Sequence, residues 1–288
     1  MKKLFYLLGV TLLLISCNGK QTQKPLDLNV MSFNVRYDNP EDSLNNWQYR
    51  KDVAAQTIKD QNADVIGTQE VLVNQLNDLK SRLPEYTAIG VGREDGIEKG
   101  EYSAIFYKKD RFNEIKSGYF WLSETPEVAG SRGWDGACER IATWAVLEDI
   151  STKTQFFFIN THLDHVGKVA RQEGVTLLLD RAVSLGKGLP IVMTGDFNAE
   201  PESDVIKHVT DTSNPNHLIH SKDIATEKNG TDWTFHGFGR VPEDKREFID
   251  YIFVSPGTKV SKHSVLNEKL NDQYISDHSV VVAQIEIQ

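Results

Sequence analysis

The chain has 288 residues, a formal net charge of −9 at pH 7 and two cysteines, Cys17 and Cys138. An acidic surface repels nucleic acid at long range, so this charge excludes a strong, non-specific DNA binder but not a nuclease with a local basic groove. An intrachain disulfide would need both cysteines, and lipidation of Cys17 would exclude it.

The N-terminus has the pattern of a bacterial lipoprotein signal. Lys2 and Lys3 precede an apolar run that is too short to span a bilayer comfortably and that ends at Ser16 and Cys17. This pattern predicts a signal peptide over residues 1–16, a lipid on Cys17 and a polar tether over residues 17–27. We therefore expect a lipid-anchored lipoprotein of the cell envelope, bound to the membrane through that lipid and otherwise monomeric.

Residues 28–288 show no internal repeat and no break in composition, which predicts a single domain. Their β-branched and aromatic content predicts buried strands at 28–35 and 63–70, with a helix that opens near Trp47 between them. Leucines at helical spacing then predict a second helix that ends before Pro84.

The later part of the domain continues this alternation. A long helix is predicted over residues 166–185, and Pro201 is expected in the first turn of a short helix that runs to His208. Further strands are predicted at residues 101–109, 141–149, 154–163, 189–197, 248–255 and 278–287. Many strands with few helices predict two packed sheets with helices outside.

Polar side chains recur at the ends of these strands. They are Asn34, Glu70, Glu101, Asn160, His162, Asp196, Asn198, Asp250, Asp277 and His278. A single Asp or Asn at a strand end is more often a turn former than a catalyst, so only the whole set carries a prediction. Such an oxygen-rich set with two histidines suits Mg²⁺, which prefers oxygen ligands and takes few protein carboxylates.

Several other kinds of site are excluded because their motifs are missing. The cysteine content excludes a cysteine-based zinc site, and the chain has no Gly-rich phosphate loop and no Gly-x-Ser-x-Gly elbow. Asp196, Asn198 and Glu200 imitate the start of an EF-hand loop, but Pro201 and Lys207 stand where that loop needs Gly and Glu.

Residues 28–287 resemble the endonuclease/exonuclease/phosphatase superfamily, which includes DNase I-like nucleases, sphingomyelinases and inositol polyphosphate phosphatases. The resemblance rests on six short motifs in the family's order, namely SFNVR, TQE, GEYSAIFY, NTHLDH, TGDFNAEP and IDYIFV…SDH. It implies an α/β fold, a four-layer sandwich of two packed, mostly antiparallel β-sheets flanked by helices. It also implies that residues 28–288 form a catalytic domain with its site at the strand edges.

The resemblance further implies a metal site and a base. Glu70, Asn34 and Asp277 would hold Mg²⁺ or Mn²⁺, with Glu70 as the principal ligand. Asp196 would orient or deprotonate the attacking water, and Asn198 would donate to the phosphate. Such groups suit a phosphoester, because its negative charge must be neutralised while the five-coordinate state forms.

Two carboxylate–imidazole pairs are implied as well. Asp250 would fix the ring of His278 so that it faces the phosphate, and Glu101 would do the same for His162. A histidine held by a carboxylate is favoured as imidazolium near neutral pH and can donate to an oxyanion.

Four further residues are candidates for binding the substrate: Asn160, Arg171, Arg140 and Trp134. The aromatic segment 117–140, which holds Trp134, is either a loop that stacks bases or a sugar, or a strand and turn that packs its rings into the core. Arg171 in the long helix either contacts the phosphate or lies on a solvated face. The sequence leaves both alternatives open.

The leading prediction is a metal-dependent phosphodiesterase or nuclease, endo- or exo-acting, that hydrolyses nucleic acid or oligonucleotides at the cell envelope. The same chemistry on a phospholipid headgroup or a small phosphomonoester is the first alternative. A non-catalytic binding lipoprotein on the same scaffold is the second. Loss of a catalytic His or Asp would mark that case, and neither is lost.

Overall fold

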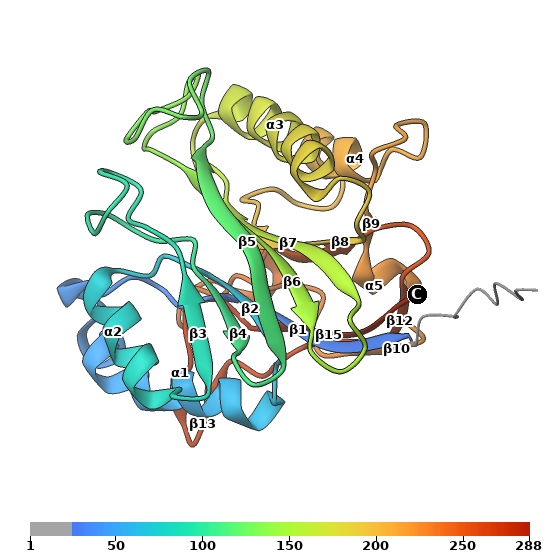
Figure 1. The fold of residues 1–288 in the computed structure, drawn as a ribbon. Helices are drawn as coiled ribbons and strands as arrows, with labels where there is room; N and C mark the ends of the chain where they lie inside the picture. The colour runs from blue at the N-terminus through green and yellow to red at the C-terminus, as the bar shows by residue number, and fades with distance from the viewer. Residues whose placement is uncertain (1–24) are drawn as a thin grey trace, which may run out of the picture.

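The computed structural model describes residues 25–288, whose arrangement is shown in Figure 1. The predicted signal peptide and most of the predicted tether, with Cys17, lie outside the described residues. The first strand, β1 (Leu26–Asn34), includes the last two residues of the predicted tether because the Leu26 side chain is buried in the core. In the described part of the chain, no helix is long and apolar enough to cross a membrane.

Two sheets form the centre of the domain (Figure 1). The first has the order β10 (Glu227–Asn229), β12 (Lys259–Val265), β15 (Val281–Ile287), β1, β2 (Val65–Gln69), β4 (Ile105–Lys108) and β3 (Tyr86–Ile89). The second has the order β5 (Phe112–Trp121), β6 (Ile141–Asp149), β7 (Gln155–His162), β8 (Ile191–Asp196), β11 (Asp250–Val254) and β9 (Ile219–His220). A small hairpin pairs β13 (Lys269–Leu270) with β14 (Gln273–Tyr274).

Helices cover the outer faces of both sheets. The helices α1 (Trp47–Gln61) and α2 (Val73–Arg82) pack on the first sheet. The second sheet is covered by α3 (Lys168–Gly186) and α4 (Asp204–Thr210), as Figure 1 shows. Shorter helical turns occur at α5 (Ser221–Ile224), Pro40–Asn45 and Glu243–Lys245. The predicted four-layer α/β sandwich is therefore confirmed.

The hydrophobic core has three buried clusters, one between each two neighbouring layers. Val30, Phe158 and Ile252 belong to a buried cluster between the two sheets. A second cluster fills the space under α1 and α2, and a third lies between the second sheet and α3. Each buried Val, Ile or Phe side chain contributes roughly 1.5–3 kcal/mol by leaving water, so these clusters hold the sheets in register.

The predicted strands and helices are found, with shifts at their ends. The short helix begins at Asp204, because Ser203 caps it by accepting from the N–H of Ile206, and Pro201 lies in the preceding turn. The short edge strands were not predicted, because two- to four-residue strands carry too few positions for a periodic pattern. The seven-residue β12 was also missed, because only Val260 and Val265 in it are apolar. In the aromatic segment β5 ends at Trp121 and a loop follows, and the buried rings of Phe120 and Trp121 fit the alternative of a strand and turn.

Candidate active site

The strand register brings the predicted polar residues to one edge of the sandwich. Asn34 ends β1, and Glu70 directly follows the neighbouring parallel strand β2. In the second sheet, Asp196 lies opposite His162 of the parallel strand β7 and opposite Asp250 of the antiparallel strand β11. Parallel strands end at the same edge, so these groups meet there.

Asn34 connects the two sheets at the centre of the site. Its Nδ2 donates to Glu70 Oε1 and to Asp196 Oδ2, each at 3.0 Å. The second Glu70 oxygen accepts from the backbone N–H of Tyr37 at 3.0 Å. Burial opposes the charge, but nearby His278 and these hydrogen bonds lower the pKa of Glu70 below its usual value. Glu70 is therefore held as a carboxylate.

Asp196 is buried between the two histidines. Its Oδ2 lies 3.5 Å from His162 Nε2 and 3.8 Å from His278 Nε2, and its Oδ1 accepts from the N–H of Asn198 at 2.9 Å. Burial, followed by the charge of Asp250, raises the pKa of Asp196 to about 7. This makes it a stronger base than an exposed aspartate.

The first predicted carboxylate–imidazole pair is formed. His278 Nδ1 and Asp250 Oδ2 are 2.8 Å apart, and both side chains are buried. Burial works against a charged ring, but the charge and hydrogen bond of Asp250, with Asp196, raise the pKa of His278 well above its usual value. His278 is therefore an imidazolium whose Nε2 faces the centre of the site.

The second predicted pair is not hydrogen-bonded. His162 Nδ1 lies 4.0 Å from Glu101 Oε2 and has no hydrogen-bond partner among the described residues. Arg93 contacts the Glu101 carboxylate instead, at 2.7 Å. Burial, with the charges of Arg140 and Arg93, lowers the pKa of His162 well below its usual value. The ring is therefore neutral, which fits the 3.0 Å contact of its Nε2 with Asn198 Nδ2.

Asn198 is placed beside the site, but its amide is already engaged. Its Nδ2 contacts His162 Nε2 and also donates to the backbone oxygen of Leu163 at 3.0 Å. Donation to a phosphate would therefore replace one of these contacts. The predicted role of Asn198 stays a prediction.

The donor set fits a hard divalent cation. Glu70, Asp196 and His162 each have a ligand atom within 4.8 Å of the other two. Asp277 lines the same pocket, and burial raises its pKa, with the charge of Glu70 adding to the rise. Several carboxylates buried together need a compensating positive charge, and oxygen donors suit Mg²⁺ or Mn²⁺. Asp277 is outside this tight group, whereas Asp196, predicted as the base, lies inside it and so next to the ion.

These groups line a pocket of about 500 Å³ that also contains three arginines, Arg36, Arg93 and Arg140. Arg140 was predicted as a substrate contact and does line the pocket, whereas Arg36 and Arg93 were missed. The Nε and Nη1 atoms of Arg140 and the Nε of Arg93 are buried without a hydrogen-bond partner in the part of the chain described. Buried donors of this kind normally have partners, so they indicate a site for an anion.

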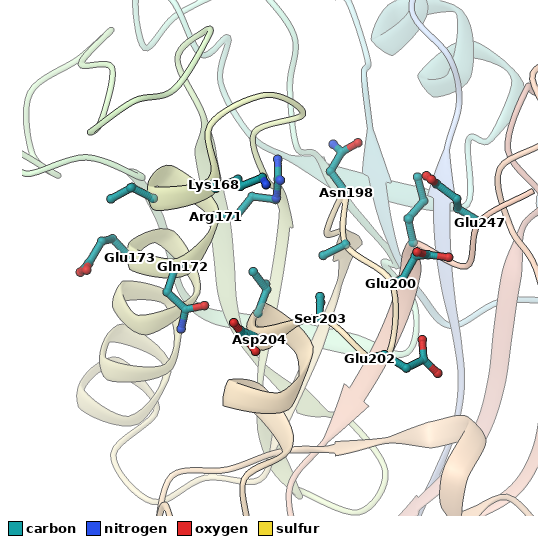
Figure 2. A pocket seen from close by; sticks show the side chains of 14 residues that line it. Lys168, Arg171, Gln172, Glu173, Asn198, Glu200, Glu202, Ser203, Asp204 and Glu247 are labelled. Carbon is teal, nitrogen blue, oxygen red and sulfur yellow. The ribbon is translucent and has the colours of Figure 1, made fainter.

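A larger groove of about 760 Å³ opens beside this pocket (Figure 2). The two cavities share Asn198, Glu247 and Ile249. Arg171, a predicted substrate contact, lines the groove rather than the catalytic pocket, and its Nη1 donates to the backbone oxygen of Asp164 at 2.7 Å. Any substrate larger than its phosphate can extend from the pocket into this groove.

Three pocket residues have a left-handed backbone conformation that non-glycine residues rarely adopt. The φ angles are 57° at Arg36, 61° at Glu70 and 47° at Asn198. Such conformations cost roughly 1–3 kcal/mol each and persist where the surrounding structure holds them, often at functional sites. At Glu70 the turn directs the carboxylate toward Asn34.

Two of the predicted substrate contacts lie elsewhere. Asn160 is completely buried between the sheets, where its Oδ1 accepts from Gln69 and Thr194 and its Nδ2 donates to the backbone oxygens of Thr68 and Ala104. All of its hydrogen-bonding groups are used, so its prediction as a substrate contact is corrected.

Trp134 is also absent from the lining of both the pocket and the groove. It lies in the loop after β5, where its backbone N–H contacts the Glu124 carboxylate at 3.1 Å. A loop anchored in this way keeps Trp134 in place away from the site.

The buried side chain of Arg50 in α1 holds backbone segments next to the site. Its buried guanidinium donates to the backbone oxygens of Val35 at 2.7 Å, Arg36 at 3.2 Å and Ile275 at 3.0 Å. These carbonyls adjoin the segments that carry Asn34 and Asp277. One side chain therefore fixes two ends of the predicted metal site relative to each other.

Comparison with known proteins agrees with this geometry. The model of the Endonuclease/Exonuclease/phosphatase family matches residues 31–278. An endonuclease/exonuclease/phosphatase from Bacteroides vulgatus is 44% identical, with a TM-score of 0.88, over 91% of this chain and 100% of that one. A mannosyl-6-phosphatase from Bacteroides thetaiotaomicron is 36% identical, with a TM-score of 0.81, over 90% of this chain and 99% of that one. Human Nocturnin is 26% identical over 73% of this chain, which spans about half of that protein (49%).

Proposed function

This chain belongs to the endonuclease/exonuclease/phosphatase family, whose members are hydrolases of phosphoesters, and we propose that it hydrolyses phosphate monoesters of small alcohols with Mg²⁺ or Mn²⁺. The sequence favoured nucleic acid as the substrate, with a phosphomonoester as the alternative. The arginines of the catalytic pocket reverse that order.

The observation that carries the proposal is the pair Arg93 and Arg140. Both line the catalytic pocket, and their buried guanidinium groups keep N–H donors without a hydrogen-bond partner in the described residues. A terminal phosphate carries more negative charge and more free oxygens than a phosphodiester. Guanidinium donors bind such oxygens strongly, so these two residues favour the monoester.

The same arrangement supplies the groups for hydrolysis. Asp196 accepts a proton from the attacking water as the water oxygen bonds to phosphorus. The imidazolium of His278 stabilises the charge on the phosphate oxygens, and as the bond from phosphorus to the alcohol oxygen breaks it gives that oxygen a proton. The proton held by Asp196 then restores the imidazolium. A divalent cation held by Glu70 and its neighbours would neutralise further phosphate charge.

Metal dependence is tested by removing and restoring the ion. We expect chelation to abolish turnover, and Mg²⁺ or Mn²⁺ to restore it. A Glu70→Gln protein should bind either ion more weakly in isothermal titration, with unchanged circular dichroism. Full turnover by a metal-free protein would contradict the proposal.

The preference for monoesters is tested by Arg140→Met. We expect kcat/KM to fall about tenfold or more for a phosphomonoester and much less for a phosphodiester, because a charged hydrogen bond to the dianion is lost. Arg132→Met is the matched control, since Arg132 is exposed in the same segment. An equal fall in kcat/KM on both substrates would contradict the preference for monoesters.

Nucleic acid is the second candidate substrate. The rings of Tyr37 and Phe235 line the catalytic pocket, where they are placed to stack on a base. Turnover of RNA or DNA at a higher kcat/KM than any phosphomonoester would establish this candidate in place of the first.

We also propose that the protein is a monomer anchored in the bacterial cell envelope through a lipid on Cys17. The support for the anchor is the pattern of residues 1–17 alone. Replacing Cys17 by Ser should abolish labelling by a fatty acid and release the protein from the membrane fraction. A variant that stayed in that fraction would contradict the anchor.

A further inference from the structure

The groove beside the catalytic pocket has two different walls. One wall is the start of α3, with Lys168 and Arg171, and the other is formed by the turn after β8, with Glu200, and by Glu247 (Figure 2). Both walls meet at Asn198, which also lines the catalytic pocket. A molecule whose phosphate occupies the pocket would therefore place its alcohol part between them.

The charges of these walls select the chemistry of that alcohol. The carboxylates of Glu200 and Glu247 repel a second phosphate, which disfavours nucleotides and a nucleic-acid strand. Lys168 and Arg171 are the two cations of the groove, beside five carboxylates that also include Glu173, Glu202 and Asp204. A cationic amine can pair with the carboxylates but cannot accept from these two donors. Hydroxyl groups can donate to the carboxylates and accept from the cations at the same time.

The size of the groove is consistent with a bound organic group. Its volume of about 760 Å³ exceeds the 500 Å³ of the catalytic pocket and lies within the usual range for small-molecule sites, roughly 300–1,000 Å³. The Glu200 side chain is exposed and makes no hydrogen bond or ion pair within the described residues, so its carboxylate is free to accept from a ligand.

We propose that this groove binds the alcohol part of the substrate and that this part is an uncharged, hydroxyl-rich group such as a glycosyl residue. The proposal rests on the proposed phosphomonoesterase activity. Glu200 and Arg171 select the alcohol, while the catalytic pocket recognises only the phosphate.

The experiment compares phosphate monoesters that differ only in their alcohol. Methyl phosphate, a hexose phosphate, phosphoethanolamine and a nucleoside bisphosphate offer a small, a hydroxyl-rich, a cationic and an anionic group. We expect the hexose phosphate to have the highest kcat/KM. In Glu200→Gln its KM should rise about tenfold at similar kcat, with methyl phosphate unchanged, because a charged acceptor of hydroxyl groups is lost.

The control is Glu243→Gln, which removes an exposed carboxylate that does not line the groove. Equal kinetic changes for hexose phosphate and methyl phosphate in Glu200→Gln would overturn the proposal. So would a preference for phosphoethanolamine or for the bisphosphate in the wild-type protein.

A separate measurement distinguishes this proposal from the proposed function. Saturation-transfer NMR with an unphosphorylated methyl glycoside and inorganic phosphate reports binding in the groove without turnover. If no phosphomonoester is hydrolysed but the glycoside binds and Glu200→Lys abolishes binding, the activity fails and the groove assignment stands. If monoesters are hydrolysed but the glycoside does not bind, the groove assignment fails alone.

Discussion

The two histidines that flank Asp196 are placed similarly but differ in charge. His278 Nε2 and His162 Nε2 lie 3.8 Å and 3.5 Å from the same Asp196 oxygen. Asp250 bonds the far nitrogen of His278 at 2.8 Å, whereas the nearest carboxylate oxygen of Glu101 is 4.0 Å from that of His162. The pKa of His278 is raised and that of His162 is lowered.

The cause of this difference is a competing cation. Arg93 binds the Glu101 carboxylate at 2.7 Å, so Glu101 is directed to a guanidinium and not to the imidazole. The charges of Arg93 and Arg140 then disfavour a second positive charge on the ring of His162. One histidine is therefore charged and placed to donate to an anion in the pocket, and the other is a neutral acceptor in contact with Asn198.

The largest expected effect comes from the carboxylate that both histidines share. Asp196→Asn removes the proposed base and should lower kcat by about 10²–10⁴-fold. Steady-state kinetics on a phosphomonoester, with circular dichroism to verify folding, measure this loss. Asp211→Asn, at an exposed aspartate outside the pocket and the groove, is the control. An Asp196→Asn protein with wild-type turnover would rule out this residue as the base.

The next effect separates the two histidines. Asp250→Asn removes the charge that keeps His278 protonated and should lower kcat by about 10²-fold, the lower end for a positioned acid. NMR of the imidazole protons should show that the pKa of His278 falls, because its charge and hydrogen-bond partner is weakened. An unchanged pKa would show that other groups hold the charge.

A smaller effect is expected on the side of His162. Glu101→Gln should lower kcat by less than about tenfold, because a contact beyond hydrogen-bond distance contributes roughly 0–1 kcal/mol. Glu101→Gln and Asp250→Asn are compared on the same substrate. Equal losses would mean that substrate binding closes the gap between Glu101 and His162.

A second pair of histidines lies outside the site and is expected to affect stability. His220 and His263 are buried with ring centroids 5.5 Å apart, and His263 contacts Ser221 Oγ at 2.9 Å. Burial, with the charges of Lys222 and Lys228, lowers the pKa of His263 to about 4. In the unfolded chain it titrates near pH 6.5, so the folded state resists protonation between these values.

The stability contributed by neutral His263 is therefore present above about pH 6.5 and is lost as the pH falls toward 4. We expect its share of the loss in the free energy of unfolding to be about 3 kcal/mol. Urea unfolding at pH 7.5, 6 and 5 measures this dependence, which His263→Gln should flatten. An unaltered pH dependence in the variant would contradict the assignment.

The sequence predicted those site residues that lie within short motifs. Asp250 and His278 meet as expected because β11 pairs with β8 and places Asp250 opposite Asp196. Glu101 did not bond His162, because Arg93, eight positions earlier in a loop without a regular pattern, binds its carboxylate. No local spacing reveals that competition, since it depends on how the loop folds back.

Asn160 lies in a motif but was predicted wrongly as a substrate contact. Its place in the motif NTHLDH suggested a substrate contact, but β7 turns this side chain toward the first sheet, where Gly67 leaves the room for it. A Cβ on Gly67 would lie 2.3 Å from Asn160 Oδ1. The need for a glycine on one strand opposite an amide on another appears only once the two sheets are stacked.

The guanidinium of Arg50 has a consequence for the order in which the chain acquires activity. It binds the backbone oxygen of Val35, next to β1, and that of Ile275, which is 225 residues after Arg50 in the chain. The strand β15, which pairs with β1, comes later still. Contacts so distant in sequence form late, because their loop-closure entropy must first be overcome. During synthesis the site therefore cannot assemble until Ile275 and β15 have emerged, and we expect no turnover from a shorter nascent chain.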